Sequence, residues 1–337
     1  MPSTTPTTSD AEPAADAAPL LASAEIHVVG PQEPVVGRVV SSRLCTRGKS
    51  ASFIRHVAID VGDTPLAGRF RAGQSFGIVP PGVDDRGRPN KLRLYSLASP
   101  SFGEDGEGRI ISTTPKRLVA ERSPQRPGDD PEDHRLFLGT CSNYVCDLRP
   151  GDEVLLTGPS GKRFLLPAEP ERHDYLFLAT GTGIAPFRGM ALELLRGPGG
   201  PVGSRVEIVM GAPYTTDLLY DDLFTELAAE HRNVAYHPVI SRERRADGGP
   251  GEYVHQHLER RLDERFREML ENPRTLVYIC GLAGMQVGVF RMFGRHGLHG
   301  HYLRLHEAIA DVEPEAWTDE QIRRRIRHGP RCMLEVY

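Results

Sequence analysis

The sequence predicts a two-domain β + α/β protein, in which an antiparallel β-barrel is followed by a doubly wound, five-stranded parallel sheet. Between residues 35 and 166, apolar residues occur in short, mostly alternating runs bounded by Gly and Pro clusters, a pattern typical of antiparallel strands. From residue 173 onward, apolar runs alternate with segments of helical spacing, as in βαβ units. Because 337 residues can bury two cores, we expect domains over residues 31–170 and 171–337.

Residues 1–30 are expected to form a disordered tail. As far as about Ala24 the chain is mostly Ala, Pro, Thr, Ser and Asp, with no Lys or Arg before Arg38, so too few apolar groups are present to offset ordering. The segment lacks the charged start and apolar centre of a signal peptide and the Arg of an organelle transit peptide. A second irregular stretch, from Glu121 to Asp133, is rich in Pro, Asp and Arg and predicts a mobile surface loop.

Six segments of the first domain have the length and alternation of strands and favour an antiparallel barrel. They are Val36–Ser41, Phe53–Asp60, Ser75–Val79, Leu92–Leu97, Arg109–Thr113 and Glu153–Thr157.

The second domain is predicted to contain five strands with crossover helices. The strands are Tyr175–Ala179, Arg205–Met210, Ala235–Ile240, Thr275–Ile279 and Cys332–Val336. The helices are Pro186–Leu195, Asp221–His231, Tyr253–Leu270, Gly284–Arg295 and Thr318–His328. The third helix has apolar residues on one face, and the last begins with the capping box Thr318-x-x-Gln321. A doubly wound sheet binds ligands beyond the carboxyl ends of its strands.

The composition excludes several classes of function. A net charge of −4, from 41 basic and 45 acidic residues, gives no reason to expect a binder of nucleic acid or of anionic membranes. No apolar run approaches the ~20 residues that a membrane span requires. Five Cys residues without Cys-x-x-Cys spacing favour reduced thiols in a cytoplasmic protein. The histidines His296, His299, His301 and His306 lack Cys or carboxylate partners at ligand spacing, so no metal site is expected.

The most informative stretch joins the first parallel strand to a helix through Gly181-Thr182-Gly183. Gly can adopt backbone angles closed to other residues, and Pro186 suits the first turn of a helix. The N–H groups at a helix N-terminus form an anion site suited to a dinucleotide pyrophosphate. Alone, the pattern also fits an ordinary strand-to-helix turn, because it is not the full six-residue fingerprint.

Two segments of the first domain carry possible ligand contacts. Alternation puts Arg93 and Tyr95 on one face of a strand and Ser96 on the other. Arg is suited to clamping a pyrophosphate and Tyr to stacking on an aromatic ring, although a half-buried edge strand would show the same residues. The small residues around Cys141 and Ser142 could hold phosphate beside such a clamp, or could form only a turn into a helix.

Three further candidates follow strands of the second domain. Ser241 and Arg242 come after the third strand, where a hydroxyl and a guanidinium suit a ribose 2′-phosphate and so NADP, although a solvated charge run is the alternative. Cys280 ends the fourth strand, where a thiol is more often a small buried apolar group. Tyr337 places an aromatic ring after the fifth strand, at the same edge of the sheet.

Together these segments resemble the plant-type ferredoxin–NADP reductases, from about Val36 to Tyr337. The matching motifs are Gly73-Gln-Ser75, Lys91-Leu-Arg-Leu-Tyr-Ser96, Lys116-Arg-Leu-Val119, Cys141-Ser-Asn-Tyr-Val-Cys-Asp-Leu-Arg-Pro-Gly-Asp152, Gly181-Thr-Gly-Ile-Ala-Pro-Phe-Arg188, Leu218-Leu-Tyr220, Ser241-Arg-Glu243, Cys280-Gly-Leu282 and Glu335-Val-Tyr337.

The resemblance implies that the barrel binds FAD. Arg93 and Ser142 would hold the FAD pyrophosphate, while Tyr95 and Tyr337 would stack on the two faces of the flavin. Ser96 would hydrogen-bond the flavin N5 region, with Glu335 hydrogen-bonded to Ser96 as part of its proton path. Further flavin-side contacts would come from Lys116, Cys141 and Thr182.

The resemblance also implies that the second domain binds NADP(H). Gly181, Thr182 and Gly183 would cradle its pyrophosphate, and Ser241, Arg242 and Tyr253 would hold the 2′-phosphate and adenine. Cys280 would lie beside the nicotinamide C4, with Gly281 and Leu282 next to it. The catalytic residues would be Ser96, Cys280, Glu335 and Tyr337.

The chain departs from the family pattern in places. The family usually has a Lys two residues before the position of Tyr253, where this chain has Gly251, and Arg244 or Arg245 could replace that phosphate contact. The family's Cys-Val before Lys116 is Thr114-Pro115 here, so a contact at the flavin edge differs. Because Lys is scarce, a basic face for docking an acidic ferredoxin would consist mainly of Arg.

The resemblance implies an FAD-dependent reductase that passes electrons between NADP(H) and a one-electron carrier, either ferredoxin or flavodoxin. An alternative is a reductase component for a dedicated oxygenase, such as a benzoyl-CoA epoxidase, with the iron–sulfur centre on another protein because this chain has no Cys cluster for one. A third alternative is a non-catalytic flavin-binding scaffold, against which the intact Ser96, Cys280, Glu335 and Tyr337 argue.

Overall fold

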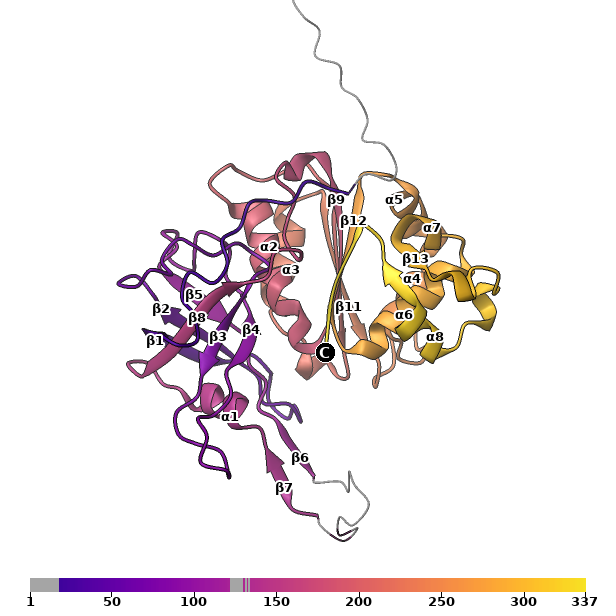
Figure 1. Ribbon diagram of the computed structural model, residues 1–337. Coiled ribbons are helices and arrows are strands. Elements are labelled where there is room, and N and C mark those ends of the chain that lie inside the picture. Colours follow the sequence, from indigo (N-terminus) through magenta and orange to yellow (C-terminus); the bar gives the residue numbers. More distant parts are fainter. Residues whose placement is uncertain (1–17, 122–129, 131, 133) are drawn as a thin grey trace, which may run out of the picture.

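The computed structural model describes residues 18–121, 130, 132 and 134–337 (Figure 1). Most of the predicted loop from Glu121 to Asp133 lies outside the described residues, as do residues 1–17 of the predicted tail. The last strand of the first sheet ends at Ser160 and the first strand of the second begins at Asp174, so the division expected at residues 170/171 falls between the two sheets.

The first domain is the predicted antiparallel barrel. Its strands follow the order β4-β3-β8-β1-β2-β5, and a bridge between Leu97 and Thr113 brings the two edges together. The apolar side chains of Val57, Phe76 and Leu156 fill the interior and are fully buried. The strands are β1 (Val35–Leu44), β2 (Arg55–Asp60), β3 (Ser75–Val79), β4 (Arg93–Ser96), β5 (Ile110–Thr113) and β8 (Glu153–Ser160).

The second domain is the predicted parallel sheet, in the order β11-β10-β9-β12-β15. Its first strand, β9, lies at the centre, so the chain winds outward in one direction and then returns to wind in the other. The carboxyl ends of β9 and β12 meet at this reversal, the place where such sheets bind ligands. The strands are β9 (Asp174–Thr180), β10 (Val206–Ala212), β11 (Val234–Ile240), β12 (Thr275–Gly281) and β15 (Cys332–Val336).

Helices cover both faces of the parallel sheet (Figure 1). Alternate side chains of β9 explain this layering, since Tyr175 and Phe177 pack towards α2 and α3 while Leu176 and Leu178 pack towards α4, α5, α6 and α8. The helices are α1 (Thr140–Asp147), α2 (Ile184–Arg196), α3 (Asp221–Glu230), α4 (Val254–Arg260), α5 (Arg267–Glu271), α6 (Ala283–Arg295), α7 (His299–Tyr302) and α8 (Asp319–Arg325).

The predicted helix from Tyr253 to Leu270 is wrong in one respect, because a π-helix (Leu262–Phe266) separates α4 from α5. Val254, Leu258, Leu262 and Phe266 recur every four residues and are all buried. Since an α-helix has 3.6 residues per turn, this spacing drifts by about 40° at each step, and the wider π turn keeps Phe266 on the buried face.

Three other short elements differ from the predictions. The end of the expected helix Thr318–His328 is instead the strand β14 (Ile326–His328), which pairs with β13 (Leu303–Leu305). The segment predicted as a turn before Tyr144 is the first turn of α1. The exposed hairpin of β6 (Val119–Glu121) and β7 (Leu136–Leu138) was not predicted, since three-residue strands leave no periodicity to recognise.

The described part of the predicted tail, residues 18–30, follows the barrel instead of extending into solvent. Its backbone pairs with the barrel through Ala22 N, which donates to Leu166 O at 2.9 Å, and through a bridge between Val29 and Gly158. The buried amide of Gln74 also donates to the carbonyl of Glu25 at 2.8 Å. The prediction of a tail is therefore wrong for these residues, because backbone hydrogen bonds replace the apolar contacts that the composition lacks.

Helix α2 joins the two domains, because it is buried on both sides. Phe177 stacks on Phe187 with ring centroids 4.9 Å apart on the sheet side, while a Cβ at Gly189 would lie 2.5 Å from Ser99 O on the barrel side. Arg188 on the same helix binds both carboxylate oxygens of Glu104 from the barrel, at 2.6 and 2.9 Å. Burial raises the pKa of Glu104, but the bonds from Arg188 outweigh it and lower the pKa overall.

Replacing Arg188 by Met should destabilise the protein by about 3 kcal/mol, because it leaves the Glu104 carboxylate without its cationic partner in a largely buried place, with the Ser112 hydroxyl still bonded to it. The matched control is Arg196→Met on the same helix, whose bonds to Glu226 and Glu230 are at the surface and should contribute less than about 1 kcal/mol. Denaturant unfolding of both variants checks this. Equal losses of unfolding free energy in the two variants would show that the interdomain Arg188–Glu104 pair contributes no more than a surface pair.

Candidate active site in the cleft between the domains

The main candidate site is a cleft between the barrel and the carboxyl edge of the parallel sheet. The barrel contributes Ser52, Ile54 and Lys116 to its wall, and the sheet contributes the residues that follow β9, β10 and β11. The predicted site residues that line this cleft are Lys116, Gly181, Thr182, Ser241, Arg242, Tyr253, Leu282 and Tyr337. Residues far apart in the sequence therefore meet in this cleft.

The glycine turn allows the backbone to pack closely at the floor of the cleft. A Cβ at Gly183 would lie 2.1 Å from Cys280 O, so only Gly lets β9 and β12 end this close together. Gly181 has φ +54°, and a Cβ added there would meet no atom within 4 Å, so the space beside it is open towards the cleft. The turn leads directly into α2, whose N-terminal N–H groups favour an anion there.

Tyr337 lies at the mouth of the cleft and is 63% exposed. Its backbone N donates to Gly281 O at 3.0 Å, and its hydroxyl lies 2.5 Å from Thr182 Oγ1. The backbone is thus fixed to the end of β12, while the ring is held through its hydroxyl, which contacts Thr182 and the backbone N–H of Gly183. Such a ring can rotate away without disturbing the sheet.

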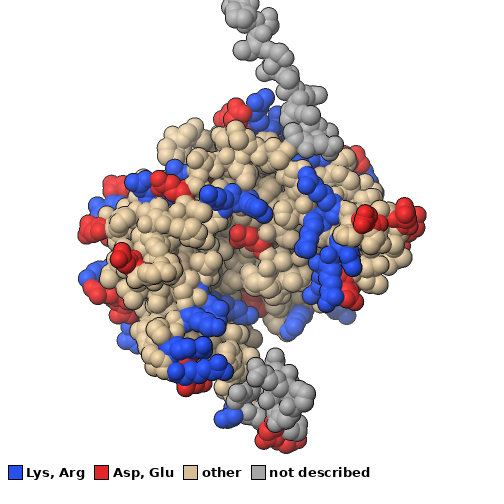
Figure 2. All heavy atoms as spheres, viewed as in Figure 1, with Lys and Arg blue, Asp and Glu red and all other residues tan. Residues whose placement is uncertain are grey.

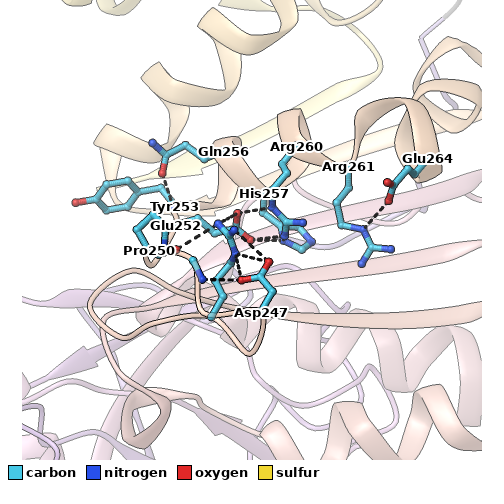
Figure 3. Close-up of polar contacts among 11 residues, drawn as sticks. Asp247, Pro250, Glu252, Tyr253, Gln256, His257, Arg260, Arg261 and Glu264 are labelled. Carbon is cyan, nitrogen blue, oxygen red and sulfur yellow. Dashed lines mark hydrogen bonds and ion pairs between the residues drawn. The ribbon is translucent and has the colours of Figure 1, made fainter.

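The loop after β11 forms the other end of the cleft. Arg242 is exposed, and its guanidinium lies 5.9 Å from the centre of the Tyr214 ring. Among the described residues no carboxylate pairs with Arg242, so its charge is available to a ligand. Tyr253 is 61% exposed (Figure 3) and stacks on His255, which the figure does not label, with ring centroids 6.0 Å apart.

The structure explains why this chain has Gly251 where the family usually has Lys. A Cβ at this position would lie 2.6 Å from Ser241 O and 2.7 Å from Glu243 O, so the loop has no room for a side chain there. Of the two expected replacements, Arg245 is already bound to Asp247 and Glu252. Arg244 donates to Gly248 O and carries no carboxylate partner among the described residues, so only Arg244 stays a candidate.

The predicted flavin-side residues surround β4 and α1. Tyr95 lies opposite Phe76 on β3, is partly buried against the barrel core, and has its pKa raised by burial. The Cys141 thiol is buried and approaches Ile78 O at 3.8 Å. The Ser142 hydroxyl accepts a hydrogen bond from Leu118 N at 3.3 Å, which connects α1 to the segment that carries Lys116 into the cleft.

Cys280 and Glu335 lie side by side on β12 and β15. The Cys280 thiol is buried below the cleft surface, and burial raises its pKa, as does the neighbouring Glu335. Burial also raises the pKa of Glu335 to about 7. A carboxyl group with this pKa exchanges a proton near neutral pH, which is the property that a proton path needs.

The expected hydrogen bond between Ser96 and Glu335 is not formed in the described part of the chain. The Ser96 carbonyl accepts from Thr113 Oγ1 at 2.9 Å, while Glu335 faces a hollow that also contains Lys162, Arg163 and His328. The register of β15 beside β12 fixes this direction, and no sequence pattern could reveal it. The two residues therefore do not form a direct relay in this structure.

Sequence reasoning missed two features of the site. Glu252 lines the cleft beside Tyr253, and its carboxylate next to a predicted phosphate site was the signal that could have identified it. The β6–β7 hairpin, beside α1, exposes apolar side chains that the interior does not use. Those at least 49% exposed are Val119, Leu136, Phe137 and Leu138.

The residues present fit both cofactors that the resemblance implies. For a dinucleotide, the cleft offers exposed Tyr rings at both ends and an uncommitted Arg242 with Ser241 beside the adenosine end. For a flavin, Tyr95 and the exposed ring of Tyr337 offer aromatic surface, and exposed Arg93 has no carboxylate partner in the described ranges. The open space beside Gly181, which lines the cleft, leaves room where a pyrophosphate needs it.

Comparison with known proteins agrees with this fit. Residues 177–290 match the family model of the oxidoreductase NAD-binding domain. The chain is 35% identical over 319 residues to the ferredoxin–NADP reductase of Picosynechococcus sp., covering 94% of this chain and 73% of that protein. It is 33% identical to the Spirulina sp. ferredoxin–NADP reductase, over 93% of this chain and 98% of that one.

A plant relative and a solved structure extend the comparison. The chloroplastic root isozyme of ferredoxin–NADP reductase from Oryza sativa subsp. japonica is 36% identical, over 93% of this chain and 77% of its own. The Plasmodium falciparum ferredoxin–NADP⁺ reductase solved with 2′P-AMP has the same fold, with a TM-score of 0.65 at 20% identity over 92% of this chain and 99% of that one. With a third of the residues shared along nearly its whole length, the chain belongs to the ferredoxin–NADP reductase family.

Proposed function

We propose that the protein is an FAD-dependent reductase that passes electrons between NADP(H) and ferredoxin. One observation supports the proposal: Lys116 of the barrel, Tyr337 and the residues Ser241, Arg242 and Tyr253 of the second domain all line one cleft. A two-electron donor bound in the second domain thereby reaches a group bound on the barrel. When bound, FAD supplies the chemistry that couples a two-electron hydride donor to a one-electron acceptor.

The barrel residues hold and orient the flavin in this proposal. Arg93 and Ser142 would hold the FAD pyrophosphate, with further contacts from Cys141 and Lys116, because α1 and the preceding segment present small and basic groups together. Tyr95 provides a fixed aromatic surface, since the barrel core packs against it. Ser96, the last residue of β4, hydrogen-bonds the reacting edge.

The second domain holds and orients the coenzyme. Gly181, Thr182 and Gly183 would cradle its pyrophosphate, and Ser241, Arg242 and Tyr253, which line the cleft, would hold the 2′-phosphate and adenine. Cys280, Gly281 and Leu282 support the nicotinamide end. Tyr337 would occupy that place at rest and would move aside for hydride transfer, because its ring is held through hydroxyl contacts with the Thr182–Gly183 turn, which can break without disturbing the sheet. Glu335 holds or releases a proton at its carboxyl group.

The partner is proposed to be ferredoxin, with flavodoxin or an oxygenase-linked iron–sulfur protein as other acceptors. Figure 2 shows Lys and Arg side chains on both domains of the face in view, with fewer Asp and Glu between them, which suits an acidic partner. We place the protein in the cytoplasm, because all five cysteines are free thiols. No helix in the described ranges has both the length and the apolarity to cross a bilayer.

The central test is an anaerobic titration of the purified protein with NADPH and then with NADH, followed by the flavin spectrum. We expect a yellow protein that NADPH bleaches stoichiometrically, and reduction of a dye acceptor when one is added. A protein that takes up no FAD would contradict the proposal, while a flavin-loaded protein without dye reduction would support a binding scaffold. Isolation of the native acceptor separates ferredoxin from an oxygenase component.

Tyr337→Ser should tighten NADP⁺ binding by about tenfold and weaken the discrimination against NAD⁺, because the ring no longer competes with the nicotinamide. Difference spectroscopy with each coenzyme measures both effects. Tyr337→Phe is the matched control, since it keeps the ring and loses only the hydroxyl with its contacts to Thr182 and the Gly183 backbone. Unchanged coenzyme binding in the Ser variant would exclude the gating role.

Glu335→Gln should change how stability depends on pH. The folded-state pKa of Glu335, about 7, lies above its ordinary 4.5, so the folded wild type holds a proton that the unfolded chain releases. The resulting stability is fully present below pH 4.5 and is lost as the pH rises through 7, by about 3 kcal/mol. Unfolding free energies measured from pH 4 to 8 should show this slope in the wild type only. A constant difference between the two proteins would argue against a raised pKa.

A further inference from the structure

Glu252 is a buried carboxylate in the wall of the coenzyme cleft. Its side chain is only 8% exposed, and it follows directly after Gly251 and precedes Tyr253. Its backbone N donates to Ile240 O at 2.9 Å, which fixes it at the carboxyl end of β11, close to Ser241 and Arg242. A negative charge therefore lies in the same wall as the groups proposed to hold a phosphate.

Three side chains hold this carboxylate (Figure 3). Arg260 of α4 donates to both of its oxygens, each at 2.8 Å, and His257 Nδ1 lies 2.8 Å from Oε1. Arg245 approaches Oε2 at 3.5 Å while it also binds Asp247. Burial raises the pKa of Glu252, but the bonds from Arg260 and His257 outweigh this and lower it to about 2. Glu252 therefore stays ionised at neutral pH.

We call Glu252, Arg260, Arg245 and Asp247 the charge cluster. Its two cations and two anions cancel, and burial lowers the pKa of His257 so that the imidazole is neutral. The loop carries other basic residues whose charge is not cancelled in this way. Arg242 and Arg244 are exposed and have no carboxylate partner among the described residues. Discrimination for a phosphorylated coenzyme thus depends on these two arginines and on how completely the cluster is neutral.

We propose that Glu252 is a specificity-determining residue that limits the preference for NADPH over NADH, with Arg260 as its counter-charge. The two coenzymes differ by one phosphate group, which carries about −1.5 to −2 charges at pH 7. A change in the net charge of the cluster therefore acts on NADPH and leaves NADH nearly unaffected. The proposal rests on the proposed function, because it concerns the adenosine end of the same coenzyme site.

Substitutions of Glu252 and of Arg260 are expected to change coenzyme binding in opposite directions. Glu252→Gln leaves the cluster with a net charge of +1 and frees Arg260 from its carboxylate, while Arg245 stays bound to Asp247, whereas Arg260→Met leaves the cluster with −1. If the Glu252–Arg260 pair only stabilised the loop, loss of either residue would loosen the loop and weaken the binding of both coenzymes equally. Opposite signs are therefore the signature of the electrostatic role.

The experiment measures binding of adenosine 2′,5′-bisphosphate and of AMP to the FAD-loaded protein by calorimetry, together with kcat/KM for NADPH and NADH. We expect Glu252→Gln to tighten bisphosphate binding about tenfold and Arg260→Met to weaken it about tenfold, with AMP binding changed less than about twofold. The double variant should return close to the wild type, and Arg260→Lys should retain wild-type discrimination. Thermal unfolding confirms that each variant is folded.

Arg261→Met is the matched control. Arg261 is the next residue, and its side chain is 35% exposed compared with 41% for Arg260. Its guanidinium lies 3.7 Å from the carboxylate of Glu264, and this pair does not line the cleft (Figure 3). Loss of a positive charge at Arg261 should leave the binding of both adenosine 2′,5′-bisphosphate and AMP unchanged. Variants of Glu252 and Arg260 that shift binding in the same direction, or that shift AMP as much as the bisphosphate, would overturn the proposal. A wild type that neither binds the bisphosphate nor oxidises NADPH would instead refute the proposed function.

Discussion

The close approach of β9 and β12 is the constraint on which the site depends. Gly183 lies against the backbone of Cys280, where any side chain would collide with the carbonyl oxygen. This contact brings the two central strand ends together at the reversal of strand order, and the loops that follow them form the floor of the cleft. The wall residues from β10, β11 and β15 take their places relative to that floor.

Much of this architecture was predictable from the sequence, because buried apolar residues recur along each strand or helix with the period of that element. The five parallel strands and the six barrel strands fall where apolar runs predict them, since each must bury one or both faces. The glycine turn could be identified because the turn needs a residue with φ +54°, at Gly181, and few residues other than Gly adopt that angle. The resemblance then assigned roles that the spacing alone left open.

The rest could not be predicted because it depends on contacts between distant segments. Ser96 and Glu335 were expected to be bonded, yet strand register turns Glu335 towards a different hollow. The π turn was hidden within an apparently regular apolar repeat, and the segment from residue 18 to 30 is held by backbone bonds that composition does not reveal. Glu252 was overlooked because its proposed role depends on its ion pair with Arg260, which forms only in the folded chain.

Helix α2 has a consequence for the energetics of the whole molecule. Its Phe187 and Met190 belong to a cluster that also contains Ile54, Ala72 and Phe164 of the barrel, so one apolar core extends across the domain boundary. Neither half can lose its structure without exposing that shared surface to water. Melting should therefore be a single cooperative transition, with a heat-capacity change that corresponds to the entire chain and not to one of its halves.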